Sequence, residues 1–255
     1  MLILIASAKT MAVNSKIKVP ETSQPRFGAE ATHLALHMTQ YPVEELSRLF
    51  KVSPKLAAEN YTRFRDFYSE DHPSLPAILA YTGVVFRNLQ LVDFTETDFL
   101  YAQDHIRIGS GLYGTLRPLD QIRPYRIEYD VRIPELGGMR IDEYWRNIQT
   151  DLFIREVKAA GGVLINLAAS DVLPSFDWKR VRQEVRVITP EFKIWRDGKP
   201  KAIVIYLKMA RGRMARYIIK NQIENPEVLK PFSWEGFCFD ESLSTENQWI
   251  YMQEG

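Results

Sequence analysis

Two short apolar runs limit the folds open to this chain more than any other feature. They are Leu2–Ile5 and the VLINL run, Val163–Leu167, and neither shows the polar alternation of a half-exposed strand. Strands of this kind are covered on both faces, as in the parallel sheets of α/β proteins. Helical and strand-like segments are mixed along the rest of the chain. The sequence therefore predicts an α/β fold, with a mixed β-sheet flanked by helices in a single domain over residues 1–255.

The other elements follow from periodicity, capping residues and turn signals. We expect helices over residues 29–40, 42–50, 54–68, 95–108, 142–160 and 210–222. We expect strands over residues 184–195 and 201–209, joined by a hairpin at Asp197-Gly198, and shorter strands over residues 237–239 and 249–252. The segment from Ser110 to Arg126 is predicted to be a loop.

Charge and composition favour a cytoplasmic protein. The net charge is +1, so only the distribution of charge can indicate a polyanionic partner. No stretch approaches the roughly 20 apolar residues that span a bilayer, and the N-terminal segment lacks the basic start of a signal peptide. The single cysteine, Cys238, excludes an internal disulfide, and its neighbours predict a buried, inert thiol. We expect a monomer with no membrane partner.

Metal and cofactor signals are weak in this sequence. His33 and His37 lie four residues apart on one predicted helix, without a cysteine or acidic residue at a useful spacing. Phosphate-binding glycine loops, nucleophile elbows and zinc-binding helix motifs are absent from the sequence. We therefore expect no metal site and no cofactor, and no established catalytic motif decides whether the chain is an enzyme.

The stretch SGLYGTLRPLDQIRPYR, from Ser110 to Arg126, is the strongest candidate for a ligand site. Its glycines allow tight turns and its prolines fix local geometry. Arginine and tyrosine side chains suit phosphates and bases. The alternative is a structural loop whose arginines pair with nearby carboxylates. The polar side chains of interest here are Ser110, Tyr113, Arg117, Asp120, Tyr125 and Arg126.

Other polar residues could converge on the same cleft. Lys9 and Thr10 follow the first strand, where open α/β sheets place their ligands, and Asn166 lies at the end of another strand. The segment KMARGRMARYIIK predicts a basic helix face, either solvated or in contact with phosphate. Its basic residues are Lys208, Arg211, Arg213, Arg216 and Lys220.

A helical hairpin is predicted over about residues 42–68. Ser53 and Pro54 are good helix-start residues, and Lys51 and Lys55 flank backbone amides that could hold one DNA phosphate. The alternative is an ordinary helical hairpin, since the turn lacks the glycines of a typical helix-hairpin-helix motif.

These segments together resemble the YaaA family of peroxide stress proteins along nearly the whole chain. The resemblance rests on LILIASAKT, KVSPKLAAENYTRF, SGLYGTLRPLDQIRPYR, LINLA, MARGRMARYII and EGFCFDE. It implies a cytoplasmic bacterial protein that limits free iron and oxidative damage to DNA and proteins under peroxide stress. It also implies DNA binding through a helix-hairpin-helix element and a basic cleft. The implied hairpin residues are Lys51, Ser53, Lys55, Asn60 and Arg63. The implied cleft residues are Lys9, Thr10, Ser110, Tyr113, Arg117, Tyr125, Arg126, Asn166, Lys208, Arg211 and Arg216.

The chain departs from the family pattern at several polar positions near the implied cleft. The departures fall at Ala6, Thr82, Val84, Ala169, Asp171 and Val172. If the family has a catalytic activity, these changes indicate a different substrate or none.

Three functions are left open. The first is DNA binding through the backbone without reading sequence. The second is an enzyme acting on a nucleotide or nucleobase. In this scheme Lys9 and Arg126 hold the phosphate, and Tyr113 or Tyr125 stacks on the base. Glu128 or Asp120 acts as general base, and Tyr113 is also a catalytic candidate. The third is a structural protein with a protein partner, in which acidic C-terminal residues balance the basic helix. Those residues are Glu235, Asp240, Glu241, Glu246 and Glu254.

Overall fold

The first strand, β1 (Leu2–Ala6), lies inside the central sheet because parallel strands pair with it on both sides. The computed structural model describes residues 1–69 and 72–253. β1 pairs with β3 and β8, and the eight-stranded sheet runs in the order β11-β12-β9-β8-β1-β3-β4, with β10 paired to β9. The predicted mixed sheet is confirmed: the β12-β9-β8-β1-β3 run is parallel, and β4, β10 and β11 pair antiparallel.

The strands of this sheet are β1 Leu2–Ala6, β3 Ile106–Ser110, β4 Gly114–Leu116, β8 Val163–Asn166, β9 Arg186–Arg196, β10 Lys199–Lys201, β11 Cys238–Phe239 and β12 Gln248–Gln253. Two small two-stranded sheets pair β2 (Leu75–Pro76) with β5 (Gln121–Ile122) and β6 (Arg132–Ile133) with β7 (Met139–Arg140). Leu2 to Ile5 are fully buried, as the apolar run predicts.

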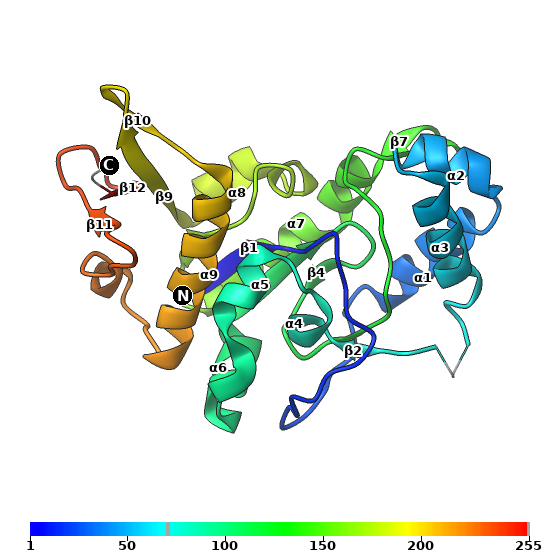
Figure 1. Cartoon of the computed structure of the whole chain (residues 1–255), viewed down its shortest axis with the longest axis horizontal. Coiled ribbons are helices and arrows are strands. Elements are labelled where there is room, and N and C mark those ends of the chain that lie inside the picture. Colours follow the sequence, from blue (N-terminus) through cyan, green and yellow to red (C-terminus); the bar gives the residue numbers. More distant parts are fainter. Residues whose placement is uncertain (70–71, 254–255) are drawn as a thin grey trace.

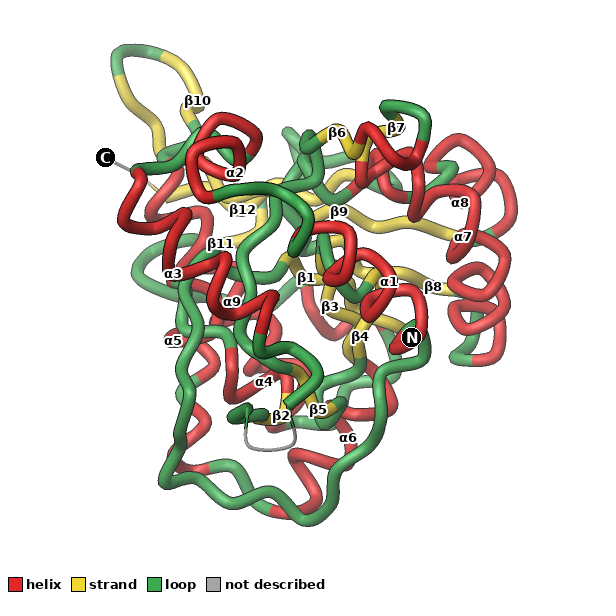
Figure 2. Tube along the Cα trace, turned by 90° about the vertical axis from the view of Figure 1, so that its right-hand side faces the viewer, coloured by secondary structure: helices red, strands yellow, loops and turns green. Residues whose placement is uncertain are grey.

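Helices cover both faces of the sheet. The pair α7–α8 packs behind it in the view of Figure 1, and the pair α6–α9 packs in front. The helices α1 to α3 form a separate group at one end of the molecule (Figures 1 and 2). The helices are α1 Gly28–Met38, α2 Val43–Leu49, α3 Pro54–Arg65, α4 Ala77–Ala80, α5 Val84–Leu89, α6 Glu96–His105, α7 Ile141–Ala159, α8 Trp178–Glu184 and α9 Val204–Lys220. Short 3-10 helices occupy η1 Leu91–Asp93, η2 Pro134–Leu136, η3 Leu173–Ser175 and η4 Pro226–Leu229.

Several secondary-structure predictions are wrong. The predicted loop from Ser110 to Arg126 contains two short strands, β4 and β5, which pair with β3 and β2. The helix expected to reach residue 108 ends at His105, because Ile106 begins strand β3 and pairs with Ile3 of β1. The strand expected over residues 201–209 is limited to Lys199–Lys201, and α9 begins at Val204. The short helices α4, α5 and α8 were not expected; the side chain of Asp177 caps α8 by accepting from the amide of Arg180. In each case pairing or packing outweighed a local pattern that fitted both helix and strand.

The prediction for Cys238 is also wrong. Its thiol is exposed, because β11 is the last strand at one edge of the sheet. An edge strand has a neighbouring strand on one side alone, so less of the protein covers its side chains.

We expect the exposed Cys238 thiol to react with a small disulfide reagent in the native state, with one equivalent of thiol released by one equivalent of protein. Absorbance of the released thiolate follows the reaction. A thiol that reacts only after addition of denaturant would contradict the exposed position.

Helices α5 and α9 approach each other closely at Gly212. A Cβ atom at this position would overlap the carbonyl oxygen of Val85 and would lie 2.7 Å from the Cβ of Asn88. Only glycine therefore lets the two backbones come this near. The approach fixes the relative position of two helices that carry residues of the candidate site described below.

Gly212→Ala should destabilise the fold by about 1–3 kcal/mol, because the added methyl overpacks a backbone contact. Urea unfolding followed by circular dichroism measures the change. Gly28→Ala is the matched control, since Gly28 has no atom within 4 Å of a Cβ. Equal stability of the two variants would show that the α5–α9 packing can relax without cost.

Candidate functional site

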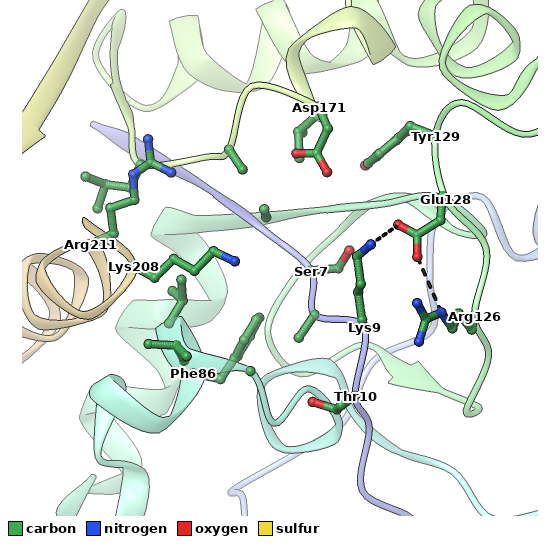
Figure 3. A pocket seen from close by; sticks show the side chains of 18 of the residues that line it. Ser7, Lys9, Thr10, Phe86, Arg126, Glu128, Tyr129, Asp171, Lys208 and Arg211 are labelled. Atoms are coloured by element: carbon green, nitrogen blue, oxygen red, sulfur yellow. Dashed lines mark ion pairs between the residues drawn. The ribbon is translucent and has the colours of Figure 1, made fainter. Parts of the chain in front are cut away.

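A cavity of about 410 Å³ opens at the carboxyl ends of β1 and β8. Ligands of open α/β sheets bind at this edge, because the loops that follow parallel strands meet there. Ala6 ends β1 and Ser7 to Thr10 follow it, and Leu167 to Val172 follow β8. The N-terminal half of α5, residues of α9 and the segment Tyr125–Tyr129 complete the wall (Figure 3).

Glu128 lies between two cations inside this cavity. Lys9 Nζ is 3.3 Å from Glu128 Oε2, and Arg126 Nε is 3.4 Å from Glu128 Oε1. The side chains of Arg126 and Glu128 are 22% and 24% exposed, whereas that of Lys9 is 64% exposed. Neither Arg126 Nε nor Glu128 Oε1 makes a hydrogen bond within the described residues, although the two atoms are close enough for an ion pair. Both atoms are buried, so a ligand in the cavity would meet the other polar atoms of these two side chains.

The backbone of Arg126 is held by the helical hairpin. Asn60 Nδ2 donates to Arg126 O at 2.5 Å, and Arg126 N donates to Asn60 Oδ1 at 2.9 Å. Asn60 is 1% exposed, so it does not reach a bound nucleic acid in this conformation. Its role in the structure is to fix α3 to the cavity wall and to orient Arg126.

The opposite wall carries Lys208 and Arg211 from α9, with Asp171 and Tyr129 above them in Figure 3. Burial lowers the pKa of Arg211, although the carboxylates of Glu191 and Asp171 act in the opposite direction. Burial raises the pKa of Tyr129 well above its ordinary value, and the charges of Tyr125 and Asp171 add to this effect. Tyr129 therefore keeps its proton at neutral pH.

Most of the departures from the family pattern lie in the cavity itself. Ala6, Val84, Ala169 and Val172 line it and make part of its wall apolar. Thr82 lies outside, where its hydroxyl donates to Thr10 Oγ1 at 3.0 Å. The polar contacts that a ligand could make here consequently come from the charged residues, Ser7 and Thr10.

The polar side chains of the central stretch point mainly into the protein. Ser110 is fully buried and its Oγ lies 2.6 Å from Tyr125 Oη, which in turn lies 2.8 Å from Tyr81 Oη. Tyr113 accepts from the amide of Arg123 at 3.0 Å. Of this stretch, Tyr125 and Arg126 line the cavity, and Tyr113 is 4% exposed away from it.

Asp120 and Arg117 hold a turn instead of facing the cavity. Asp120 is fully buried and accepts from Arg117 N at 2.7 Å, Arg117 Nη2 at 2.9 Å and Ser23 Oγ at 2.6 Å. This is the structural alternative that the sequence left open. Asp120 cannot act as a general base on a cavity ligand from this position.

Removal of the Asp120 carboxylate should therefore cost stability. Asp120→Ala leaves buried donors without an acceptor, and we expect a loss of about 2–4 kcal/mol in the free energy of unfolding. Urea denaturation measures it. The control is Asp151→Ala, which removes an exposed ion pair with Arg180 and should change stability by less than about 1 kcal/mol. A small effect at Asp120 would mean that the turn has another source of rigidity.

The basic face of α9 is largely neutralised by the segment before and within α6. Arg216 pairs with Asp93 at 2.5 Å, Lys220 with Asp98 at 2.8 Å, and Arg213 donates to Gln90 Oε1 at 2.6 Å. Arg216, which the sequence places in the cleft, does not line the cavity for this reason. The acidic C-terminal residues are not the ion-pair partners of Arg216 and Lys220, and Glu254 lies outside the described residues.

Asn166 is also directed away from the cavity. It is 4% exposed, donates to Thr189 Oγ1 at 3.3 Å and accepts from the amide of Ala168. Its hydrogen bonds support the turn after β8.

The predicted hairpin residues have separate environments. Lys51 pairs with Asp130 at 2.8 Å, Arg63 pairs with Glu59 at 2.5 Å, and Ser53 accepts from the amide of Leu56 at 3.4 Å as the N-cap of α3. Lys55 is exposed, with no ion pair among the described residues. Helices α2 and α3 form at the predicted positions and contact each other. Their assignment as a helix-hairpin-helix motif stays a prediction.

A second groove, of about 340 Å³, joins this hairpin to the cavity. Phe50 and Lys51 line one end of it, and Lys9, Arg126 and Asp171 line the other. The groove makes the hairpin and the cavity one continuous surface.

Tyr129 was not singled out from the sequence, and Asp171 was noted only as a departure. A tyrosine three residues after an arginine gives no signal by itself; only the fold brings Tyr129 opposite the loop after β8.

No cluster of three potential metal ligands occurs within the described ranges, and His33 and His37 contact each other at 3.1 Å. Within residues 1–69 and 72–253, none of the helices is both long and apolar enough to span a membrane.

Comparison with known proteins defines the class. A family model described as "Peroxide stress protein YaaA" matches residues 1–243. A "UPF0246 protein" of Parabacteroides distasonis is 57% identical over 254 residues, which is 100% of both chains. A relative from Bacteroides fragilis is 56% identical over 98% of both chains, and one from Porphyromonas gingivalis is 43% identical over 100% of both. The chain belongs to the YaaA family of peroxide stress proteins.

Proposed function

We propose that this protein binds DNA through its sugar–phosphate backbone, and does so in the cytoplasm during peroxide stress. One observation carries the proposal: exposed cations border a continuous surface that runs from the α2–α3 hairpin through the groove to the cavity. Backbone contacts of this kind need cations at the surface and no particular base sequence.

Lys208 lines the cavity, and Lys55 lies in the first turn of α3, next to the groove-lining hairpin residue Lys51 in the α2–α3 turn region. Lys55 and Lys208 both reach solvent, and neither has an ion pair among the described residues. Lys9 is largely exposed but shares Glu128 with Arg126. At the start of α3 the amides of Leu56 and Ala57 are bonded to Ser53 and Pro54 has no N–H, so the amides of Ser53 and Lys55 offer the position for one phosphate, as in a helix-hairpin-helix element. Lys51 takes a left-handed backbone conformation, with φ of 52°, at the turn where glycine would be usual.

The proposal extends to the wider role that the family resemblance implies. DNA held by the protein during peroxide stress would be shielded from iron-driven oxidation, and the protein would limit intracellular free iron and damage to DNA and proteins. This part of the proposal is supported by family membership alone.

Charge reversal at these two lysines tests the DNA binding. Lys55→Glu with Lys208→Glu should weaken binding of a labelled duplex at least tenfold. It should also reduce the slope of log K against log salt by about one for each phosphate that the protein no longer neutralises. Fluorescence anisotropy at several salt concentrations measures both quantities.

Lys18→Glu with Lys16→Glu is the matched control, because it changes the net charge equally on a segment outside the groove. Loss of binding in the control as well would mean that net charge, and not this surface, governs the interaction. No binding of the wild type at low salt would overturn the proposal.

A second candidate is an enzyme acting on a nucleotide or nucleobase. The carboxylate of Glu128 favours it, because that group is partly enclosed between two cations that could hold a phosphate. The positions of Asp120 and Tyr113 away from the cavity leave Glu128 as the general base in this scheme.

A further inference from the structure

Two histidines on α1 lie apart from the cavity and the groove. His33 and His37 are about one helical turn apart, so their side chains lie on the same face of the helix. Their Nε2 atoms are 3.1 Å apart, whereas the centres of the two rings are 4.4 Å apart, so the nitrogen-bearing edges of the rings face each other. His33 is exposed and His37 is half-buried, which leaves the pair accessible from solvent.

The separation of the two nitrogens falls in the range that a transition metal sets between neighbouring ligands. A metal lies about 2.0–2.1 Å from the nitrogen of an imidazole ligand. Two such nitrogens are therefore about 2.9 Å apart at a right angle and about 3.3 Å apart at a tetrahedral angle. The observed 3.1 Å lies between these values. A hydrogen bond between the rings suits the same distance, and a bound metal takes the place of its proton.

The helix that carries the pair is held firmly. Leu34 and Met38 on its inner face are fully buried, and Tyr68 Oη donates to Thr32 O at 2.7 Å. Figure 1 shows α1 packed within the group of helices at one end of the molecule. Because the backbone already holds both rings one turn apart, a metal that binds them loses little affinity to the ordering of its ligands. His37 also lies in the last turn of α1, where the helix dipole favours a cation.

We propose that His33 and His37 bind one divalent transition-metal ion of the class that prefers imidazole nitrogen, such as Cu²⁺, Ni²⁺ or Zn²⁺. Mg²⁺ and Ca²⁺ prefer oxygen ligands and should not bind here. Within the described ranges no further His, Cys, Asp or Glu joins the pair as a third ligand. Water or a group from another molecule completes the coordination, so the site binds its metal reversibly, unlike a structural site closed by four protein ligands.

The spacing alone did not predict this site, because histidines four residues apart can take rotamers that point in different directions. The structure adds the approach of the two Nε2 atoms. The site is independent of the proposed DNA binding, since neither histidine lines the cavity or the groove.

Titration calorimetry tests the binding on the full, untagged chain. Cys238→Ser is introduced first, because the exposed thiol is itself a metal ligand. This protein should bind one equivalent of Cu²⁺, should bind Zn²⁺ more weakly as the general order of affinities requires, and should not bind Mg²⁺. His33→Gln and His37→Gln, each added separately, should weaken Cu²⁺ binding about tenfold or more, because a single imidazole loses the gain from two linked ligands.

His105→Gln is the matched control, since it removes a histidine of α6 that contacts the N-terminal residue and Glu224 instead. It should bind Cu²⁺ as the Cys238→Ser protein does. Circular dichroism checks that each variant keeps its helical content. Because the side chain of His33 is exposed, His33→Gln tests the site even if His37→Gln disturbs the packing of α1.

Electron paramagnetic resonance identifies the ligands directly. With one equivalent of Cu²⁺, the spectrum should show coupling to the nitrogens of two imidazoles, and to that of one imidazole in His33→Gln or His37→Gln. These spectra together with the loss of affinity in both variants would support the site. Absence of saturable Cu²⁺ binding would overturn it. Binding that neither variant weakens, or that His105→Gln weakens equally, would also overturn it.

Discussion

The parallel hydrogen bonding of β1 to β3 and β8 positions the loops after β1 and β8, which line the cavity. Ile3 pairs with Ile106 on one side and with Ile165 on the other, so the carboxyl ends of three strands lie at one edge. The loops that follow these strands therefore lie at the same edge of the sheet, and their polar residues lie close together there. Lys9 and Asp171 are 162 positions apart in the numbering and meet for this reason alone.

The Asn60 clamp extends this arrangement to the helical hairpin. Two hydrogen bonds join a buried amide side chain to the backbone of Arg126, in both directions. An asparagine is well suited to this, since its amide pairs with a backbone amide as another strand would. The hairpin and the cavity wall are therefore joined directly through Asn60.

The electrostatic pattern shows why net charge is uninformative here. Arg216 and Lys220 look from the sequence like part of a basic patch, but Asp93 and Asp98 neutralise them. Lys55 and Lys208 have no such partners among the described residues, and Glu128 draws Lys9 and Arg126 together at the cavity. Ion pairs between distant segments neutralise many of the cations. Only a small subset of the lysines and arginines is therefore available to bind a polyanion.

The sequence by itself determined the buried central strands, most helix positions and the family. Leu2–Ile5 is apolar throughout, Ser53-Pro54 starts a helix by capping chemistry, and Thr95 with Asp98 forms the capping box that begins α6. It also marked Lys9, Arg126, Lys208 and Arg211, all of which line the cavity. Only the tertiary structure decided that Ser110, Tyr113 and Asp120 are internal supports, that Asn60 orients Arg126, and that Tyr129 faces Asp171. Local patterns report what a residue can do, whereas burial and partner choice depend on contacts between segments far apart in the chain.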